Sequence, residues 1–224
     1  ALSDSDKAHY YYHDGTLDVR YRESGSFFSF FHSLGRKNLE ILIPRSLASN
    51  LSEISGDVVS ADTTINGLST KDFYLDTVSG NLTFNGSAER INSDSVSGDC
   101  HITSSVTPQK IDMESVSGDI SVSIPSNSEF EAENDSVSGD LTCSFAGTKK
   151  DDKFVCGSGI NRYDFDTVSG DVEILSAGGC DIFSFQPNTC RAQTEPSVPK
   201  QRFFLNLSHK VALLFNYQAS SSEV

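Results

Sequence analysis

Acidic residues recur at two fixed distances from a repeated Ser-Gly step, and carboxylates in such a pattern can bind cations or exchange protons. One set directly follows the glycine of each step: Asp57, Asp99, Asp119, Asp140 and Asp171, with Asn81 in the second copy. The other set lies four residues before the glycine: Asp76, Asp94, Glu114, Asp135 and Asp166, with Ser52 in the first copy. If the copies stack, each set becomes a column of like charges about 4.8 Å apart.

Neighbouring carboxylates in such a column repel by roughly 1 kcal/mol in bulk water, and by more in less polar surroundings. We expect each carboxylate to face solvent and to accept backbone N–H groups of its own corner, which relieves the repulsion. A row of Ca²⁺ sites is the alternative, because this ion prefers several carboxylate and carbonyl oxygens. The calcium-binding pattern G-G-x-G-x-D is absent. We therefore predict no cofactor and keep Ca²⁺ as the less favoured alternative.

The same acids could serve an enzyme, since polysaccharide lyases and hydrolases with paired carboxylates occur among parallel β-helices. Asp119 with Asp140, or Asp94 with Glu114, would supply the pair, and Arg90 or Lys110 the base. A catalytic pair would break the repeat at one copy, however, whereas these acids recur in nearly every copy. No G-x-S-x-G, H-E-x-x-H or phosphate-binding glycine motif occurs. We predict a protein that is not an enzyme, with a polysaccharide-active enzyme as the alternative.

The repeats are the elements that must position these acids. The phrase reads EISGDV at 53–58 and TVSGNL at 77–82, and further copies follow at 95–100, 115–120, 136–141 and 167–172. Their glycines are Gly56, Gly80, Gly98, Gly118, Gly139 and Gly170, separated by 24, 18, 20, 21 and 31 residues. This period is too short for helical repeats or propeller blades. It suits one rung, meaning one coil of chain, of a β-solenoid.

Apolar residues alternate with polar ones after each glycine, as half-buried strands require. Two positions after the glycine stand Val58, Leu82, Cys100, Ile120, Leu141 and Val172. Two positions before it stand Ile54, Val78, Val96, Val116, Val137 and Val168. We expect these columns to point inward and to form a dry core between stacked parallel strands. Glycine at each corner indicates a positive φ or a lack of room for a Cβ.

The repeats define a β-solenoid over residues 51–176 with a hairpin or loop inserted at 144–163. Residues 1–50 are expected to form N-terminal strands and a cap, with an apolar loop at 26–35. Cys143 and Cys156 could clasp the insertion. These are two of the 5 cysteines, which we expect mainly as small buried hydrophobic residues.

Residues 177–224 contain no Ser-Gly-Asp rung and are interpreted as a linker followed by a C-terminal cap. Cys180 and Cys190 form a further possible pair within this segment. The apolar spacing at 201–218 fits a helix, and a pair of strands nearly as well. We expect this segment to cover the last rung or to form an oligomer contact.

A formal net charge of −14, from 31 acidic and 17 basic residues, argues against nucleic acid and anionic membranes as partners. No apolar stretch reaches the 18 or more residues of a membrane span, so we predict no transmembrane segment in this chain. A rigid stack with a repeated polar face suits a glycan, peptide or protein ligand held by many weak contacts. The negative charge favours a cationic partner.

The serial V-S-G-D corners, preceded by NLEILIPRSLASNLSEISGDV, resemble the bacterial adhesin-like family DUF4097 over residues 15–176. This resemblance implies a single-stranded, right-handed parallel β-helix, here of about six short rungs with an N-terminal strand cap. It also implies a place at the bacterial cell envelope or in the secreted fraction, and no established catalytic residues. The expected function is a non-enzymatic binding or structural module that presents the acidic repeat face.

Overall fold

The computed structural model of the protein describes residues 8–21, 37–150, 153–177, 200–207 and 211–216. These residues form strands and one four-residue helix, α1 (Arg45–Ala48), so the predicted all-β class is confirmed. The strands are β1 (Ala8–His13), β2 (Thr16–Tyr21), β3 (Lys37–Pro44), β4 (Leu51–Ser79), β5 (Leu82–Ser97), β6 (Cys100–Ser104), β7 (Lys110–Ser117), β8 (Ile120–Pro125), β9 (Phe130–Ser138), β10 (Leu141–Cys143), β11 (Thr148–Lys150), β12 (Lys153–Cys156), β13 (Asn161–Ser169), β14 (Val172–Ala177), β15 (Lys200–Leu207) and β16 (Val211–Asn216).

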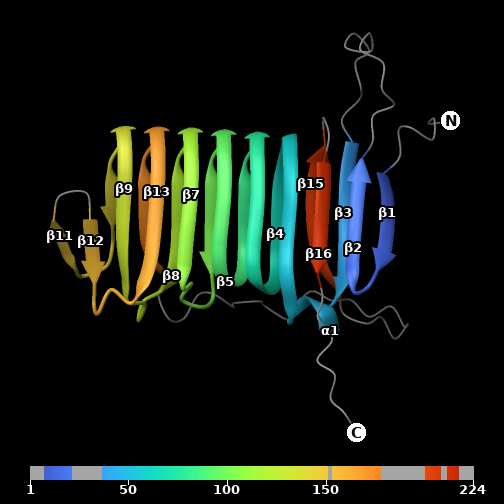
Figure 1. The fold of residues 1–224 in the computed structure, drawn as a ribbon, viewed down its shortest axis with the longest axis horizontal. Helices are drawn as coiled ribbons and strands as arrows, with labels where there is room; N and C mark the ends of the chain where they lie inside the picture. The colour runs from blue at the N-terminus through green and yellow to red at the C-terminus, as the bar shows by residue number, and fades with distance from the viewer. Residues whose placement is uncertain (1–7, 22–36, 151–152, 178–199, 208–210, 217–224) are drawn as a thin grey trace, which may run out of the picture.

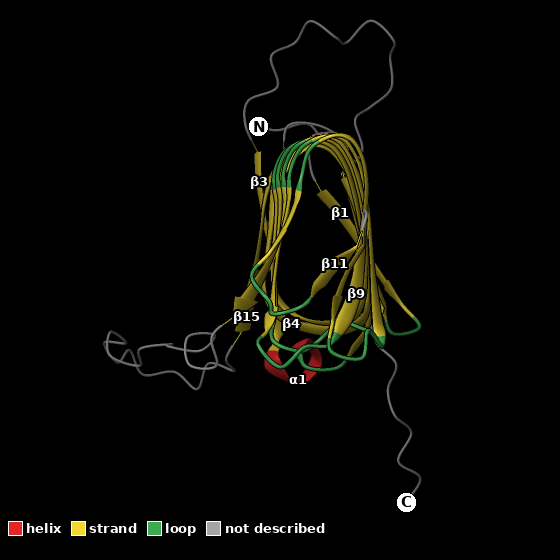
Figure 2. Cartoon of the chain, turned by 90° about the vertical axis from the view of Figure 1, so that its left-hand side faces the viewer, coloured by secondary structure: helices red, strands yellow, loops and turns green. Residues whose placement is uncertain are grey.

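Strands of stacked rungs pair in parallel and form two walls that meet in an arch (Figure 1 and Figure 2). In one wall the pairing order is β4, β5, β7, β13, β9, and in the other it is β5, β6, β8, β14, β10. The register keeps equivalent residues side by side, with Thr77 opposite Ser95 and Ser95 opposite Ser115. Each corner residue therefore belongs to a column that crosses the stack.

The last repeat does not occupy the end of the stack, contrary to the expectation of successive coils. Thr167 of β13 pairs with Ser115 of β7 on one side and with Ser136 of β9 on the other. The outer edge of β9 is occupied by the antiparallel hairpin of β11 and β12, with Val155 opposite Glu131. Because the inserted segment at 144–163 covers that edge, the final rung lies between the fourth and the fifth.

The first rung is displaced by five residues from the register that the repeat suggests. Gly56 lies within β4, opposite Leu213 of β16, and has no positive φ. The residue stacked on Gly80 is Ala61, and Asp62 follows it. The true first copy is therefore DVVSAD at 57–62, with alanine in the place of glycine. This copy therefore lacks the Ser-Gly step that the other copies share.

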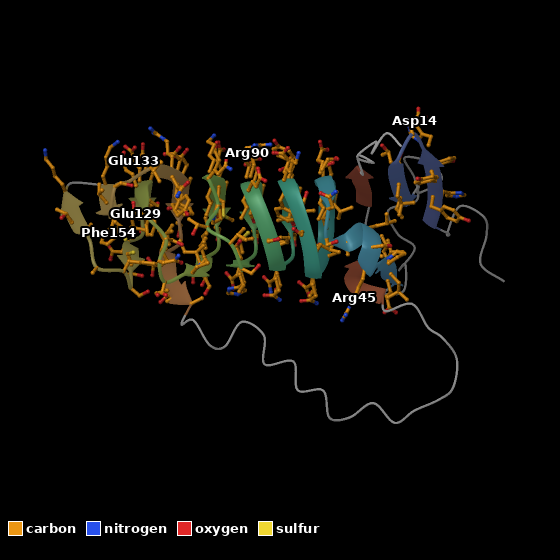
Figure 3. The ribbon with its side chains drawn as sticks, turned by 90° about the horizontal axis from the view of Figure 1, so that it is seen from below. Asp14, Arg45, Arg90, Glu129, Glu133 and Phe154 are labelled. Atoms are coloured by element: carbon orange, nitrogen blue, oxygen red, sulfur yellow. The ribbon has the colours of Figure 1, made fainter. Side chains whose placement is uncertain are left out.

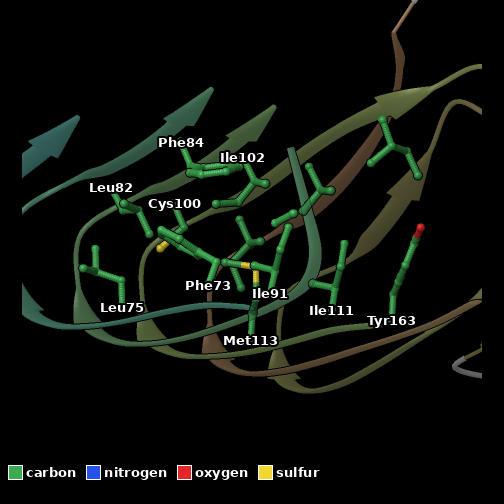
Figure 4. Close-up of a cluster of buried hydrophobic side chains, with 14 of the residues drawn as sticks. Phe73, Leu75, Leu82, Phe84, Ile91, Cys100, Ile102, Ile111, Met113 and Tyr163 are labelled. Atoms are coloured by element: carbon green, nitrogen blue, oxygen red, sulfur yellow. The ribbon is translucent and has the colours of Figure 1, made fainter. Parts of the chain in front are cut away.

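The core lies between the two walls and is built from columns that alternate along each strand (Figure 4). Residues seven before the corner glycine, such as Phe73 and Ile91, and two after it, such as Leu82 and Cys100, are buried. The valines two before the glycine are exposed, contrary to expectation; Val78, Val96 and Val116 are each 49% exposed. Successive side chains of a strand point to opposite faces. The small hydroxyl residue three before the glycine points inward, so the valine points outward.

The C-terminal strands pair beside the first rung rather than over the last one. β15 pairs antiparallel with β3 and β4, and β16 with β2 and β4. The described residues of the segment 201–218 thus form two strands and not a helix. The apolar loop at 26–35 and the pair Cys180 and Cys190 lie outside the described residues. Among the described residues, no helix has the length and apolarity needed to cross a membrane.

Candidate binding groove

From the second rung onward, each corner packs against a neighbouring corner so closely that only glycine fits. Gly98 has a φ of +128°, and a Cβ there would lie 2.2 Å from the carbonyl oxygen of Gly80. Gly118 has a φ of +146°, and its Cβ would lie 2.2 Å from the carbonyl oxygen of Gly98. Both readings of the repeated glycine, a positive φ and no room for a side chain, are therefore correct here.

The carboxylates directly after the corners form a hydrogen-bonded ladder, but not with their own corners. Asp99 Oδ1 accepts the backbone N–H of Asp119 at 3.0 Å, and Asp119 Oδ1 accepts that of Asp171 at 2.9 Å. Asp171 Oδ1 accepts the N–H of Asp140 at 3.0 Å. Asp62 begins the ladder in the place expected for Asp57, by accepting from Asn81. These side chains join neighbouring rungs, which gives them a structural role.

The hydroxyl groups three before the glycine close the corners from inside. Ser115 Oγ donates to the carbonyl oxygen of Gly118 at 3.2 Å, and Ser95 Oγ to that of Gly98 at 3.4 Å. The hydroxyl of Thr77 has no hydrogen-bond partner among the described residues. The inward hydroxyl column is the reason why the next column, the valines, faces outward.

We call the acids four residues before each corner the outer acid column. In spatial order they are Asp57, Asp76, Asp94, Glu114, Asp166 and Asp135. Asp57 therefore belongs to the outer acid column and not to the ladder. Ser52, which the sequence placed in this column, lies outside it. All of these side chains are exposed, and no described Lys or Arg forms an ion pair with any of them.

Several basic residues of the same wall are paired with other acids. Arg90 forms an ion pair with Asp72, and Lys110 contacts Asp112 at 2.6 Å. Further along the stack, Lys153 contacts Glu133 at 2.9 Å. Figure 3 shows Arg90 and Glu133 projecting along the same edge of the stack. Arg90 and Lys110, the basic residues considered for an enzyme, thus neutralise acids that lie outside the outer acid column.

The outer acid column and the exposed valines line one open groove of about 580 Å³. The valine column is Val59, Val78, Val96, Val116, Val168 and Val137 in spatial order, and all but Val137 line the groove. Acids of all six rungs contribute to the same lining. The groove therefore crosses the stack, with an apolar strip beside an unpaired row of carboxylates.

The family model described as Toastrack DUF4097 matches residues 2–107 and 84–175, which is more than half of the chain. The chain belongs to the DUF4097 family. One solved structure is similar to this DUF4097 chain: "a putative cell adhesion protein from Clostridium sporogenes ATCC 15579". It is 8% identical, with a TM-score of 0.41, over 63% of this chain and 100% of that one. No curated protein matches the sequence.

Carboxylates of this DUF4097 chain raise one another's pKa across neighbouring rungs of the groove. Burial, followed by the charge of Asp94, raises the pKa of Asp76. The charges of Asp94 and Asp166, together with burial, raise the pKa of Glu114. Burial and the charge of Asp135 raise the pKa of Asp166. The field of the column is therefore distributed over several rungs, and a cation held there would relieve it.

The ladder carboxylates are already engaged with backbone N–H groups, which lowers their availability to a metal ion. In the part of the chain that the structure describes, no group of three or more His, Cys, Asp and Glu side chains is arranged to hold one. The absence of a cofactor stays a prediction, with Ca²⁺ as the less favoured alternative.

The described cysteines carry free thiols, and the clasp considered for the insertion is absent between Cys143 and Cys156. Burial raises the pKa of the Cys100 thiol to about 11, and burial also raises the pKa of Cys143 and of Cys156. Neutral thiols are poor nucleophiles and poor metal ligands. These residues therefore act as small packing groups.

The sequence analysis does not predict the groove, because it places the valines in the core. The alternation of side chains along each strand does indicate that these valines face outward. Residues seven, five and three before the glycine share one face, so a residue two before it must lie on the other. Counting from the buried Phe73 or Ile91 places Val78 and Val96 outside.

Proposed function

We propose that this chain is a non-enzymatic, adhesin-like binding module that engages a cationic protein or peptide through the groove. Its extracytoplasmic location, at the bacterial envelope or in the secreted fraction, is part of the proposal. The observation that carries it is the union of an apolar strip and an unpaired carboxylate row across all six rungs of the stack. Contact with the apolar strip contributes affinity, and the carboxylates select a partner of positive charge.

Repetition favours binding over catalysis. The outer acid column keeps an acid in every rung, so each rung offers the same weak contact, and affinity grows with the number of contacts made at once. A hydrolase or lyase needs two acids in different environments with different pKa values. Here the pKa values of Asp76, Glu114 and Asp166 are all raised.

The charge distribution supports binding of a cationic partner in the groove, as opposed to unspecific binding of cations anywhere on the acidic surface. Basic residues of the same wall are held in ion pairs next to the groove. The groove carboxylates form no ion pair with a described Lys or Arg, so their charge is not neutralised locally. Low-dielectric walls of a cleft strengthen the field of the charges along it.

The test compares two variants of the full chain that carry the same change in net charge. Asp76→Asn, Asp94→Asn and Glu114→Gln together remove three of the six groove charges, and Asp99→Asn, Asp119→Asn and Asp171→Asn remove three charges from the ladder. Asn81 shows that an amide sustains the ladder bond, because its Oδ1 accepts the N–H of Asp99. The control variant should therefore keep its fold.

The measurement is binding to poly-L-lysine by surface plasmon resonance at several salt concentrations. We expect the groove variant to lose about tenfold in affinity, which corresponds to three modest exposed ion pairs, and the ladder variant to lose much less. Affinity of the wild-type chain should fall as salt rises. Equal losses in both variants, or binding that salt does not weaken, would contradict the proposal.

A further inference from the structure

We infer that the groove takes a polyproline II peptide that runs across the rungs and carries a basic residue at every third position. This inference deepens the proposed function and rests on it. It names the conformation and the spacing of the ligand, and both follow from the repeat distance of the stack and the order of its two columns.

The carboxylate row has the spacing of paired strands. Neighbouring acids such as Asp76 and Asp94 come from directly paired strands, and the parallel register is continuous through β4, β5, β7, β13 and β9. Paired strands lie about 4.8 Å apart, so alternate rungs lie about 9.6 Å apart. Asp76, Glu114 and Asp135 occupy alternate rungs, as do Asp57, Asp94 and Asp166.

Polyproline II is the peptide conformation that matches this spacing best. Its rise of about 3.1 Å gives about 9.3 Å between every third residue, so three basic residues drift by only about 0.6 Å against the row. An extended strand repeats its side chains at about 6.6 Å, which matches neither one rung nor two. The side chains on one face of an α-helix repeat at about 5.4 Å along its axis. Over the length of the groove they would shift by about 3 Å against the row of acids.

The valine column supplies the surface on which the rest of such a peptide would pack. Each exposed valine lies two residues from an acid of the same strand and therefore on the same face, as Val78 does relative to Asp76. Proline rings between the basic residues would contact this strip. Proline also holds the preceding residue in the extended region, which lowers the entropy lost on binding.

Charge complementarity favours a basic peptide over a second copy of this chain. A copy would bring a further formal charge of −14 toward the acid column, and like charges across an interface are costly. Self-association through this face is thus the competing outcome that the experiment must detect.

Three peptides of identical composition, acetylated and amidated, isolate the spacing. They are Lys-Pro-Pro-Lys-Pro-Pro-Lys, Pro-Lys-Pro-Lys-Pro-Lys-Pro and Lys-Lys-Lys-Pro-Pro-Pro-Pro. Isothermal titration calorimetry with the full chain at low salt gives each affinity. We expect the first peptide to bind about threefold tighter than the others. The preference is modest because the lysine stem is flexible and exposed ion pairs are weak.

A second comparison tests the apolar strip with a matched control. Val96→Ser with Val116→Ser removes two exposed groove valines, whereas Val106→Ser removes a valine that is 43% exposed outside the groove. We expect the groove variant to bind the first peptide about fivefold more weakly and the control variant to bind it unchanged. Circular dichroism should give superimposable spectra for all three proteins.

The outcomes separate this inference from the proposed function. Equal affinity for the three peptides, with poly-L-lysine binding still dependent on the groove acids, overturns the spacing and leaves the proposed function intact. Poly-L-lysine binding that ignores the groove acids overturns both. A dimer seen by sedimentation with wild-type chain alone, and lost in the Val96→Ser, Val116→Ser variant, assigns the groove to a second copy and also overturns the inference.

Discussion

Gly98 shows how little freedom a single corner residue has in this stack. Its φ of +128° is rare for residues with a side chain, and the carbonyl group of Gly80 fills the space that a Cβ would need. Its neighbour Asp99 links the rungs by accepting the N–H of Asp119. The corner thus combines a glycine, which has no side chain, with an aspartate, whose carboxylate accepts a hydrogen bond from the next rung.

We expect Gly98→Ala to destabilise the chain by about 3 kcal/mol, the upper range for a strained backbone, because both the φ and the contact with a backbone carbonyl are unfavourable. Gly56→Ala is the matched control, since Gly56 lies in β4 without a positive φ. Urea unfolding followed by circular dichroism gives both values. Equal destabilisation by the two substitutions would show that the corner tolerates a Cβ.

The strands translate one sequence position into one column. In β5, β7 and β13 the acid, the hydroxyl residue and the valine that precede each corner point outward, inward and outward in turn. Direct pairing then places acid beside acid. Pairing has a cost, because the acids of neighbouring strands raise the pKa of Glu114.

A pH dependence of stability follows from these columns. The pKa values of Asp76, Glu114 and Asp166 are raised above the ordinary values of 3.8 for aspartate and 4.5 for glutamate. Between the unfolded and the folded pKa the folded chain binds more protons, so these groups destabilise it as pH rises through that window. The penalty is complete above the folded values and absent below the unfolded ones.

We therefore expect the variant Asp76→Asn, Glu114→Gln, Asp166→Asn to unfold at higher urea concentration than wild type at pH 7. This advantage should shrink as the pH falls toward the ordinary carboxyl range. Urea midpoints of both proteins between pH 7 and pH 4 give the measurement. An advantage that grows on acidification would refute the account.

The whole molecule stacks its rungs in an order that differs from the chain. β13, from the last repeat, separates β7 from β9, and β14 separates β8 from β10. The hairpin of β11 and β12 covers the far edge, where Lys149 and Lys150 are exposed. Lysines on an edge strand discourage further strand addition. This end of the stack is thereby closed.

Disulfide trapping tests the order directly. Glu114→Cys with Asp166→Cys joins directly paired strands, where Cα atoms about 4.8 Å apart suit a disulfide, whereas Glu114→Cys with Asp135→Cys spans two rungs and exceeds the limit of about 7 Å. We expect the first pair to oxidise readily and the second not to. Peptide mapping by mass spectrometry distinguishes the new bond from the native cysteines. Efficient trapping of the second pair would restore the sequential order.

The sequence by itself determined the repeated strands, five of the six corners and the inward column after each glycine. Val-Ser-Gly-Asp recurs because the corner needs glycine and a neighbouring rung needs an acceptor. The need for glycine is legible in the repeat, whereas the sequence assigned the acceptor to its own corner. The inward column after each glycine, such as Leu82 and Ile120, was predicted from alternation alone. The outward direction of the valines also follows from alternation, provided that the count starts at the buried residue seven positions before the glycine.

Only the tertiary structure decided the first corner, the place of the last rung and the existence of the groove. Ala61 serves as a corner because it stacks on Gly80, a contact between residues 19 apart that no local pattern reports. β13 lies between β7 and β9 because the hairpin occupies the other edge of β9. Local propensities act within a few residues, whereas strand order and a surface that crosses rungs depend on which edges are free when distant segments meet.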